Sequence, residues 1–368
     1  MIWNGEGLKK LLDQKGCTIS ALATALKISR PTVHGWINGQ APKGFFLLQL
    51  CDFFQIGPEA FFSEREVADI SIPLHRTSRG AKLTPEMDRV ARELAQEYAL
   101  FFKNSKVRTM VPVLRANIRD KINADILANE LRKMAGTDPA LPINYQSAFA
   151  LIEKLGIIAV FRDFPESLKK SKAFYAKIFG HRVIFINADT NFLDLIFHLL
   201  HEAVHALRDD TPGATGKEEE AFCDKVASLT QFPEPYILSL AHMIKGNSAA
   251  NAVIILKSYA ETNSHALYGV QKRIDAIGLW PAGINTSSLH GAEANVRKKF
   301  PPISKILLSS GDARDFVEQM KTLSPGFITL LACYLPQCSD RKLGELLGLD
   351  NSPDASLLRE ELQRIPQK

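Results

Sequence analysis

His201-Glu202-Ala203-Val204-His205-Ala206-Leu207 is the stretch that decides how most of this chain is interpreted. It continues an apolar segment that begins at Leu195, so we expect a half-buried helix. Residues four apart share one face of a helix, and His201 and His205 can therefore bind the same metal ion. Glu202 projects about 100° around the axis from His201, from where its carboxylate can reach a water on the metal. The pattern predicts a zinc site of the peptidase type.

A simpler interpretation treats His201 and His205 as polar residues on a half-buried helix without a metal. The surrounding sequence argues against it, because burying histidine and glutamate without partners is costly. The metal site is therefore the favoured prediction, and its third ligand has to come from elsewhere in the chain.

The third ligand is expected on a second helix. The stretch from Arg208 to Gly216 is rich in Gly, Pro, Thr and Asp, which predicts a turn that returns the chain against the first helix. Glu220 and Asp224 share a face of the following helix. Glu220 is the expected zinc ligand, and Asp224 is expected to hydrogen-bond a ligand histidine. Glu219 stays open as the alternative ligand, since consecutive glutamates also suit a solvated helix start that the helix dipole favours.

Three segments extend this pattern, and they occur in the order Val183-Ile184-Phe185-Ile186-Asn187, Phe197-His198-Leu199-Leu200-His201-Glu202-Ala203-Val204-His205 and Glu220-Ala221-Phe222-Cys223-Asp224-Lys225-Val226-Ala227. Together they resemble the ImmA/IrrE family of metallopeptidases, over roughly residues 140–280. In that family a strand ending in Ile-Asn precedes the zinc helix, and a later glutamate segment supplies the third ligand. This chain departs from the family at Cys223, where a small residue is usual, and at Asp224, where Asn is commoner. The resemblance implies bound Zn²⁺ and a gluzincin-like hydrolase.

The first sixty-odd residues have the pattern of a separate helical unit. Leucines at helical spacing predict a first helix that stops at Gly16, and Thr18 caps a second helix. Ser29 caps a third helix with Pro31 in its first turn. A fourth amphipathic helix includes residues 47–54. Two helices joined by a tight turn inside such a unit are typical of a helix-turn-helix domain.

The run Ile28-Ser29-Arg30-Pro31-Thr32-Val33-His34-Gly35-Trp36-Ile37-Asn38-Gly39 resembles the recognition helix of Xre/Cro-type DNA-binding domains. The resemblance implies that this helix enters the major groove of an operator, in a possible homodimer on paired half-sites. The residues implied to contact DNA are Arg30, Thr32, Val33, His34, Asn38 and Lys43. Val33 has a second interpretation, as a residue that packs on the second helix. A protein-docking module on the same fold is the competing function, because fold alone does not fix function.

Composition limits the class of protein. The chain has 368 residues, which exceeds one ordinary core, and its 46% hydrophobic and 23% charged residues are typical of globular proteins. No apolar run reaches the roughly 18 residues that span a membrane. The start lacks the basic and apolar regions of a signal peptide. Five cysteines without a close-spaced pair suit a reducing compartment, so we expect a cytoplasmic protein with no membrane partner.

The expected fold is α+β and mostly helical, in four segments. Residues 1–66 form an all-α helix-turn-helix domain, and residues 67–140 a helical linker region. Residues 141–298 form a zincin-like domain with the zinc helix and a small antiparallel sheet, whose strands we expect at 157–161, 173–178 and 182–187. Residues 299–368 form a helical extension of unknown role.

The sequence therefore predicts a DNA-binding transcriptional regulator joined to a zinc endopeptidase. In this hypothesis His201, His205 and Glu220 hold Zn²⁺, and Glu202 acts as the general base. The family resemblance implies a repressor-type protein as substrate, in stress or mobile-element control. The alternative is a transcription factor or antitoxin without proteolysis, which uses the metallopeptidase-like domain as a sensor or docking surface.

Overall fold

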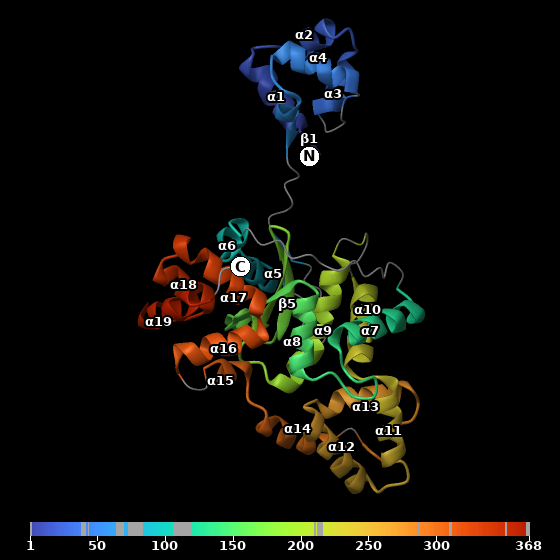
Figure 1. The fold of residues 1–368 in the computed structure, drawn as a ribbon. Helices are drawn as coiled ribbons and strands as arrows, with labels where there is room; N and C mark the ends of the chain where they lie inside the picture. Colours follow the sequence, from blue (N-terminus) through green and yellow to red (C-terminus); the bar gives the residue numbers. More distant parts are fainter. Residues whose placement is uncertain are drawn as a thin grey trace. The chain divides into compact units, whose positions relative to one another are not determined.

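The computed structural model describes residues 2–37, 42, 44–63, 70–72, 84–105, 119–209, 211, 216–285, 287–308, 311–349 and 352–365. The chain divides into two compact units, Met1–Ala68 and Asp69–Lys368 (Figure 1). The first unit has its own hydrophobic core, separate from the two clusters of the second. The finer boundaries at residues 140 and 298 stay a prediction. No helix among the described residues is both long enough and apolar enough to cross a bilayer.

The first unit is a small helical domain. Its elements are β1 (Ile2–Trp3), α1 (Gly5–Gln14), α2 (Ile19–Ala25), α3 (Arg30–Ile37), α4 (Gly44–Phe54), η1 (Pro58–Phe61) and β2 (Phe62–Ser63), and β1 pairs antiparallel with β2. Gly16 has φ +61° just past α1, a conformation that favours glycine. The Thr18 side chain accepts a hydrogen bond from the Ala21 backbone N–H, as expected for an N-cap.

Trp36 lies at the centre of this unit. Leu8, Leu22 and Val33 are buried in the same cluster. The Trp3 indole N–H donates to the Trp36 carbonyl oxygen at 2.7 Å, which fastens the amino-terminal strand to α3. The exposed face of α3 therefore rests on a packed core, although the helices and strands of this unit are short.

The second unit contains a four-stranded sheet in the order β3-β5-β6-β4. The strands are β3 (Ile70–Ser71), β4 (Ile157–Arg162), β5 (Ala173–Ile178) and β6 (His181–Asn187). β5 and β6 form an antiparallel hairpin, and Phe179 and Gly180 have φ +46° and +83° in its two-residue turn.

The predicted antiparallel sheet is wrong in one respect, because β4 runs parallel to β6 and the sheet is mixed. After β4 the chain skips the neighbouring position in the sheet and forms β5 one place further on. The hairpin then brings β6 back into the skipped position, so that β6 lies between β4 and β5. Nearly every residue of β4 and β6 is buried. Such continuous apolar strands are typical of sheets covered on both faces.

Helices cover both faces of this sheet. α8 (Tyr145–Lys154) and α9 (Phe192–Arg208) pack on one face. On the other face Phe185 contacts Tyr98, which links α5 (Pro85–Gln96) to α6 (Ala99–Lys103), with ring centroids 5.3 Å apart. This double cover holds α9, which carries the His-Glu-x-x-His motif, rigidly on β5 and β6.

Two further helices complete the surroundings of α9. α7 (Lys121–Ala135) and α10 (Lys217–Gln231) pack on each other, and α10 packs along α9 (Figure 1). The chain thus returns against α9, as the composition of residues 208–216 predicts. On α7, Ile126 is 50% exposed, whereas Leu127 and Leu131 are buried. Ala124 and Ala128 are buried on α7, where small side chains allow close approach of the neighbouring helix.

A second hydrophobic cluster joins four helices, α11 (Glu234–Ile244), α12 (Ala249–Asn263), α13 (Leu267–Ala276) and α14 (Ser288–Lys299). Ser264 has φ +53° and forms the C-cap of α12. The Leu267 backbone N–H donates to the Glu293 carboxylate at 2.7 Å at the start of α13. The buried His265 side chain lies between these helices, with Nε2 2.6 Å from the Tyr236 hydroxyl oxygen.

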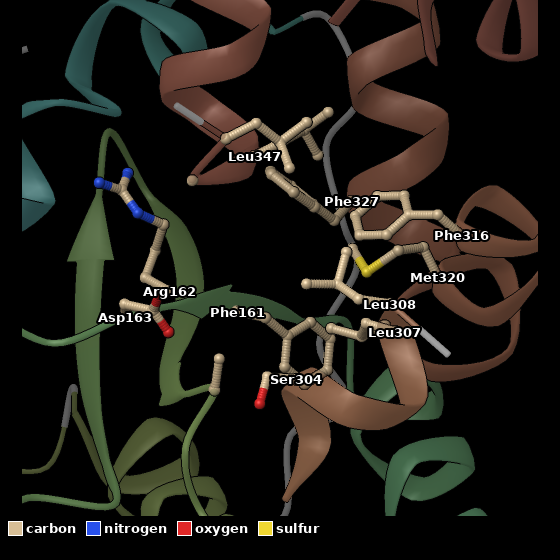
Figure 2. Close-up of a pocket in the computed structure, with 13 residues that line it drawn as sticks. Phe161, Arg162, Asp163, Ser304, Leu307, Leu308, Phe316, Met320, Phe327 and Leu347 are labelled. Atoms are coloured by element: carbon tan, nitrogen blue, oxygen red, sulfur yellow. The ribbon is translucent and has the colours of Figure 1, made fainter. Parts of the chain in front are cut away.

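The carboxy-terminal helices are part of the sheet's core. They are α15 (Ile303–Leu307), α16 (Ala313–Leu323), α17 (Pro325–Tyr334), α18 (Asp340–Leu347) and α19 (Ser352–Gln363). The Ser324 hydroxyl donates to the Ala159 carbonyl of β4 at 2.7 Å. Figure 2 shows Phe316, Met320 and Leu347 gathered around a small apolar pocket beside β4, while Arg162 points away from it. The helices α15 to α19 are therefore part of the core that surrounds the sheet.

Candidate functional site

The predicted metal ligands meet at one point between α9 and α10. The Nε2 atoms of His201 and His205 are 3.1 Å apart. The Glu220 carboxylate lies 3.0 Å from His205 Nε2 and 3.6 Å from His201 Nε2. Ligands of a tetrahedral zinc ion with bonds of about 2.0–2.1 Å are about 3.3 Å from one another. The three side chains therefore have the spacing of a zinc site.

Burial makes this cluster costly without a cation. His201, His205 and Glu220 are 7%, 5% and 6% exposed. Both carboxylate oxygens of Glu220 are buried without a hydrogen bond of acceptable geometry. A buried carboxylate that faces only imidazole nitrogens suits a metal ion, which would neutralise it. The residues thus fit bound zinc by charge as well as by spacing.

The outward nitrogen of each imidazole has its own neighbour. Asp224 Oδ1 lies 3.0 Å from His201 Nδ1, as its position on α10 predicts. Cys223 Sγ lies 3.6 Å from His205 Nδ1, a contact that the sequence interpretation missed. Its spacing of three residues from Glu220 was the available signal. These contacts orient both rings so that Nε2 faces the metal position.

Glu219 is engaged differently from Glu220. Its carboxylate accepts two hydrogen bonds from the Arg208 guanidinium, at 2.6 and 3.0 Å, and forms an ion pair with Arg119 at 2.9 Å. Glu219 does lie within ligand distance of His205 and Cys223. Because both of its oxygens already face arginines, the geometry favours Glu220 over Glu219 as the third ligand.

The cluster attracts positive charge strongly. Burial disfavours the charged form of His201, but the nearby carboxylates of Asp224 and Glu220 outweigh it and raise the pKa of His201 to about 10. Burial likewise opposes ionisation of Glu220, yet the two histidines hold its pKa far below the usual range. Without metal, a proton takes the position that a cation would otherwise fill.

Glu202 faces a small pocket beside the ligands. Its Oε2 accepts a hydrogen bond from the Tyr175 backbone N–H of β5 at 2.9 Å, and burial raises its pKa. The pocket, of about 120 Å³, is lined by Ser171, Lys172, Ala173, Phe197, His198, His201, Glu202, Glu220, Asp224 and Lys272. Open space next to the ligands is a property of catalytic rather than structural zinc sites.

His198 and Lys272 are pocket residues that the sequence interpretation did not assign. His198 precedes His201 by three positions on α9, a spacing that places both on one face. Burial and the nearby charge of His201 lower the pKa of His198 to about 4, so it is neutral at pH 7. A neutral imidazole can donate one hydrogen bond to a polar group in the pocket.

Asp209 anchors the end of the zinc helix to the sheet. It accepts hydrogen bonds from the Tyr175 hydroxyl at 2.7 Å and from Arg182 at 2.8 Å, and it pairs with Lys177 at 3.1 Å. All three partners lie on β5 and β6. This anchor fixes the distance between Glu202 on α9 and the Tyr175 backbone.

The residues that are predicted to contact DNA differ in how exposed their side chains are. Arg30 and His34 are exposed on α3, and Thr32 is half-buried beside Ser29. Val33 is 0% exposed, which agrees with its packing interpretation rather than with a base contact. Asn38 and Lys43 lie outside the described residues.

A helix-turn-helix family model matches residues 8–61. This match supports a DNA-binding regulator, and it extends from within α1 through α4 to η1. It gives no support to the ImmA/IrrE resemblance of the later residues. Comparison with curated proteins and with solved structures finds no match.

Proposed function

We propose that this protein is a DNA-binding regulator whose second unit is a zinc-dependent endopeptidase. The observation that carries the proposal is the meeting of His201, His205 and Glu220 at zinc-ligand spacing, beside a pocket that also contains Glu202. The helix-turn-helix match supports DNA binding by the first unit. A cytoplasmic location is part of the same proposal.

Each residue of the site has a distinct role in this mechanism. When bound by His201, His205 and Glu220, zinc supplies Lewis-acid chemistry that polarises a peptide carbonyl and a water molecule. Glu202 accepts the proton of the attacking water at the oxygen that does not bond Tyr175 and passes it to the leaving amine. The Tyr175 N–H holds Glu202 in place, and the raised pKa of Glu202 makes it a better proton acceptor.

The sheet offers a place for an extended substrate. At the outer edge of β5, the pairing with β3 involves only Ile178 and Lys177 among the described residues. Ala173, at the other end of β5, lines the metal pocket. A peptide segment could add as a strand beside residues 173–176 and present its carbonyl to the site. A repressor is the proposed substrate, because the DNA-binding unit would concentrate the enzyme near DNA-bound proteins.

The second candidate is a transcription factor or antitoxin in which the metal site acts as a sensor. It is favoured by the extent of the family match, which is confined to residues 8–61. The two candidates share the metal centre and differ only in hydrolysis.

Metal analysis tests the shared part. We expect about one zinc ion per chain in the wild type and a loss of zinc in His205→Ala. His242→Ala is the matched control, since it removes an exposed histidine from α11. Equal zinc in wild type and His205→Ala would refute the site.

Hydrolysis is tested on zinc-loaded protein incubated with candidate repressors, with mass spectrometry of the products. Glu202→Gln should retain zinc and lose cleavage. Cleavage that persists in this variant would exclude Glu202 as the base. Bound zinc without cleavage of any repressor by the wild type would favour the sensor.

A further inference from the structure

A larger pocket, of about 720 Å³, lies among α7, α10, α11 and α13. This volume is within the range of small-molecule sites. Its lining residues are on elements different from β5, and the metal ligands do not belong to it. The part of the lining used below consists of Arg132, Lys133, Lys225, Leu229, Arg273 and Ile277.

Arg273 is the unusual residue of this pocket. It is 5% exposed, and its Nε is buried without a hydrogen-bond partner among the residues that the structure describes. Within the described part of the chain no carboxylate forms an ion pair with it; Asp125 and Glu234 act on it only at longer range. A buried guanidinium without a carboxylate is costly, and burial lowers the pKa of Arg273. An anion in the pocket would remove that cost.

The surroundings of Arg273 are also basic. Arg132 is buried and donates to the carbonyl oxygens of Thr230, Asp138 and Leu141, so its charge is solvated by dipoles rather than cancelled by a carboxylate. Basic side chains outnumber acidic ones in the lining: Lys121, Arg132, Lys133, Lys225 and Arg273 against Asp125 and Glu234. The pocket therefore has a positive potential.

We propose that this pocket binds the oxyanion group, phosphate or carboxylate, of a small organic molecule. Arg273 has the planar geometry that binds either group through two nitrogens. Lys225 supplies a second charge, and Leu229 and Ile277 contact the apolar part of the molecule.

The larger pocket and the metal pocket share two helices, α10 and α13. Lys225 follows Asp224 on α10, and Arg273 follows Lys272 on α13. Asp224 and Lys272 line the metal pocket, whereas Lys225 and Arg273 line the larger one. An anion bound at Arg273 thus contacts the two helices that border the metal site.

The test is a titration of the full-length, zinc-loaded protein with inorganic phosphate and, separately, with succinate. Thermal unfolding is measured at each concentration, and NaCl keeps the ionic strength constant. One of the two anions should raise the melting temperature saturably. Arg273→Gln should increase its Kd about 10-fold or more, as expected for a lost charge-assisted hydrogen bond. Lys225→Ala, at a half-buried position, serves where Arg273→Gln does not fold, and it should also weaken binding.

The control is Lys298→Ala, which removes an exposed charge on α14. It should bind as the wild type does, and zinc content measured in every variant separates this pocket from the metal centre. A response to phosphate alone identifies a phosphate-bearing ligand, and a response to succinate alone identifies a carboxylate. No stabilisation by either anion beyond NaCl, or the same Kd in wild type and both pocket variants, would overturn the proposal.

Discussion

The two units carry their candidate sites in opposite ways. In Met1–Ala68 the side chains proposed to contact DNA, Arg30 and His34, are exposed on a short helix, and a family model matches a contiguous segment. In Asp69–Lys368 the candidate ligands are buried between α9 and α10. A surface site depends on the fold beneath it, whereas a buried site is also part of the core. Substitutions in the site of the first unit should therefore change DNA binding without changing stability. Substitutions in the site of the second unit should change metal binding and stability together.

The largest expected effect concerns the core of the first unit. Trp36→Ala removes a buried side chain next to Val33, which should cost about 3–5 kcal/mol. A domain this small has little stability in excess of that, so it should unfold and lose DNA binding. Hydrogen exchange measured by mass spectrometry should show rapid exchange in α1 to α4. Zinc content should be unchanged, and a parallel loss of zinc would mean that the units do not fold independently.

Metal removal is the converse test on the second unit. A ligand at 1,000 times its Kd stabilises the folded state by about 4 kcal/mol. Chelation should therefore lower the melting temperature of the second unit and leave exchange in α1 to α4 unaffected. His201→Ala should melt like the chelated wild type and should show no response to added zinc. Stabilisation of that variant by zinc would place the metal elsewhere.

Local sequence predicted the caps and most elements in both units. The predicted caps Thr18 and Ser29 each accept a backbone hydrogen bond at a helix start, and Thr84 and Asn144 do the same in the second unit. These signals act over three or four residues, and so they can be read without knowledge of the fold. Burial on α7 depends on which helices pack there, so local sequence does not reveal that Ile126 is exposed while Ala124 and Ala128 are buried.

Features that depend on residues far apart in the chain could not be predicted from the sequence, because they also depend on tertiary packing. The parallel pairing of β4 with β6 depends on a crossover that alternation of side chains does not record. Glu219 and Glu220 are adjacent and chemically identical, and only the positions of Arg208 and Arg119 distinguish them. The close approach of His201 and His205, by contrast, could be predicted, because residues four apart share one face of a single helix.

The next prediction concerns pH and the buried His265. Burial lowers its pKa to about 4, from an ordinary value near 6.5. The unfolded chain then takes up a proton that the folded one excludes, so stability is lost as the pH falls from about 6.5 to 4, by about 3 kcal/mol in total. Urea unfolding of the second unit between pH 7 and 4 measures this. His265→Gln keeps an acceptor for the Tyr236 hydroxyl and should show a smaller pH dependence; an unchanged slope would contradict the assignment.

A smaller effect is expected on the exposed face of α3. Arg30→Ala with His34→Ala should weaken binding to the DNA upstream of the gene at least about 10-fold, since single base contacts contribute about 1–3 kcal/mol. Thermal stability should change by no more than about 0.5 kcal/mol, because both side chains are exposed. Fluorescence anisotropy over a salt series is the measurement, and Lys305→Ala in the second unit is the control. Unchanged affinity in the double variant would exclude this face as the one that binds DNA.

The smallest expected effect tests whether local sequence signals set the start of a helix in the first unit, as its sequence pattern implies. Thr18→Ala removes the side-chain acceptor of the Ala21 N–H, and should cost about 1 kcal/mol of folding free energy. Thr24→Ala is the matched control: Thr24 lies on the same helix, and its hydroxyl donates only to the Ser20 carbonyl, within α2. Urea unfolding followed by tryptophan fluorescence compares the two, because Trp3 and Trp36 both lie in this core. Equal destabilisation by both variants would show that the cap does not set the start of α2, and that tertiary packing positions the helix here, as it does at α7.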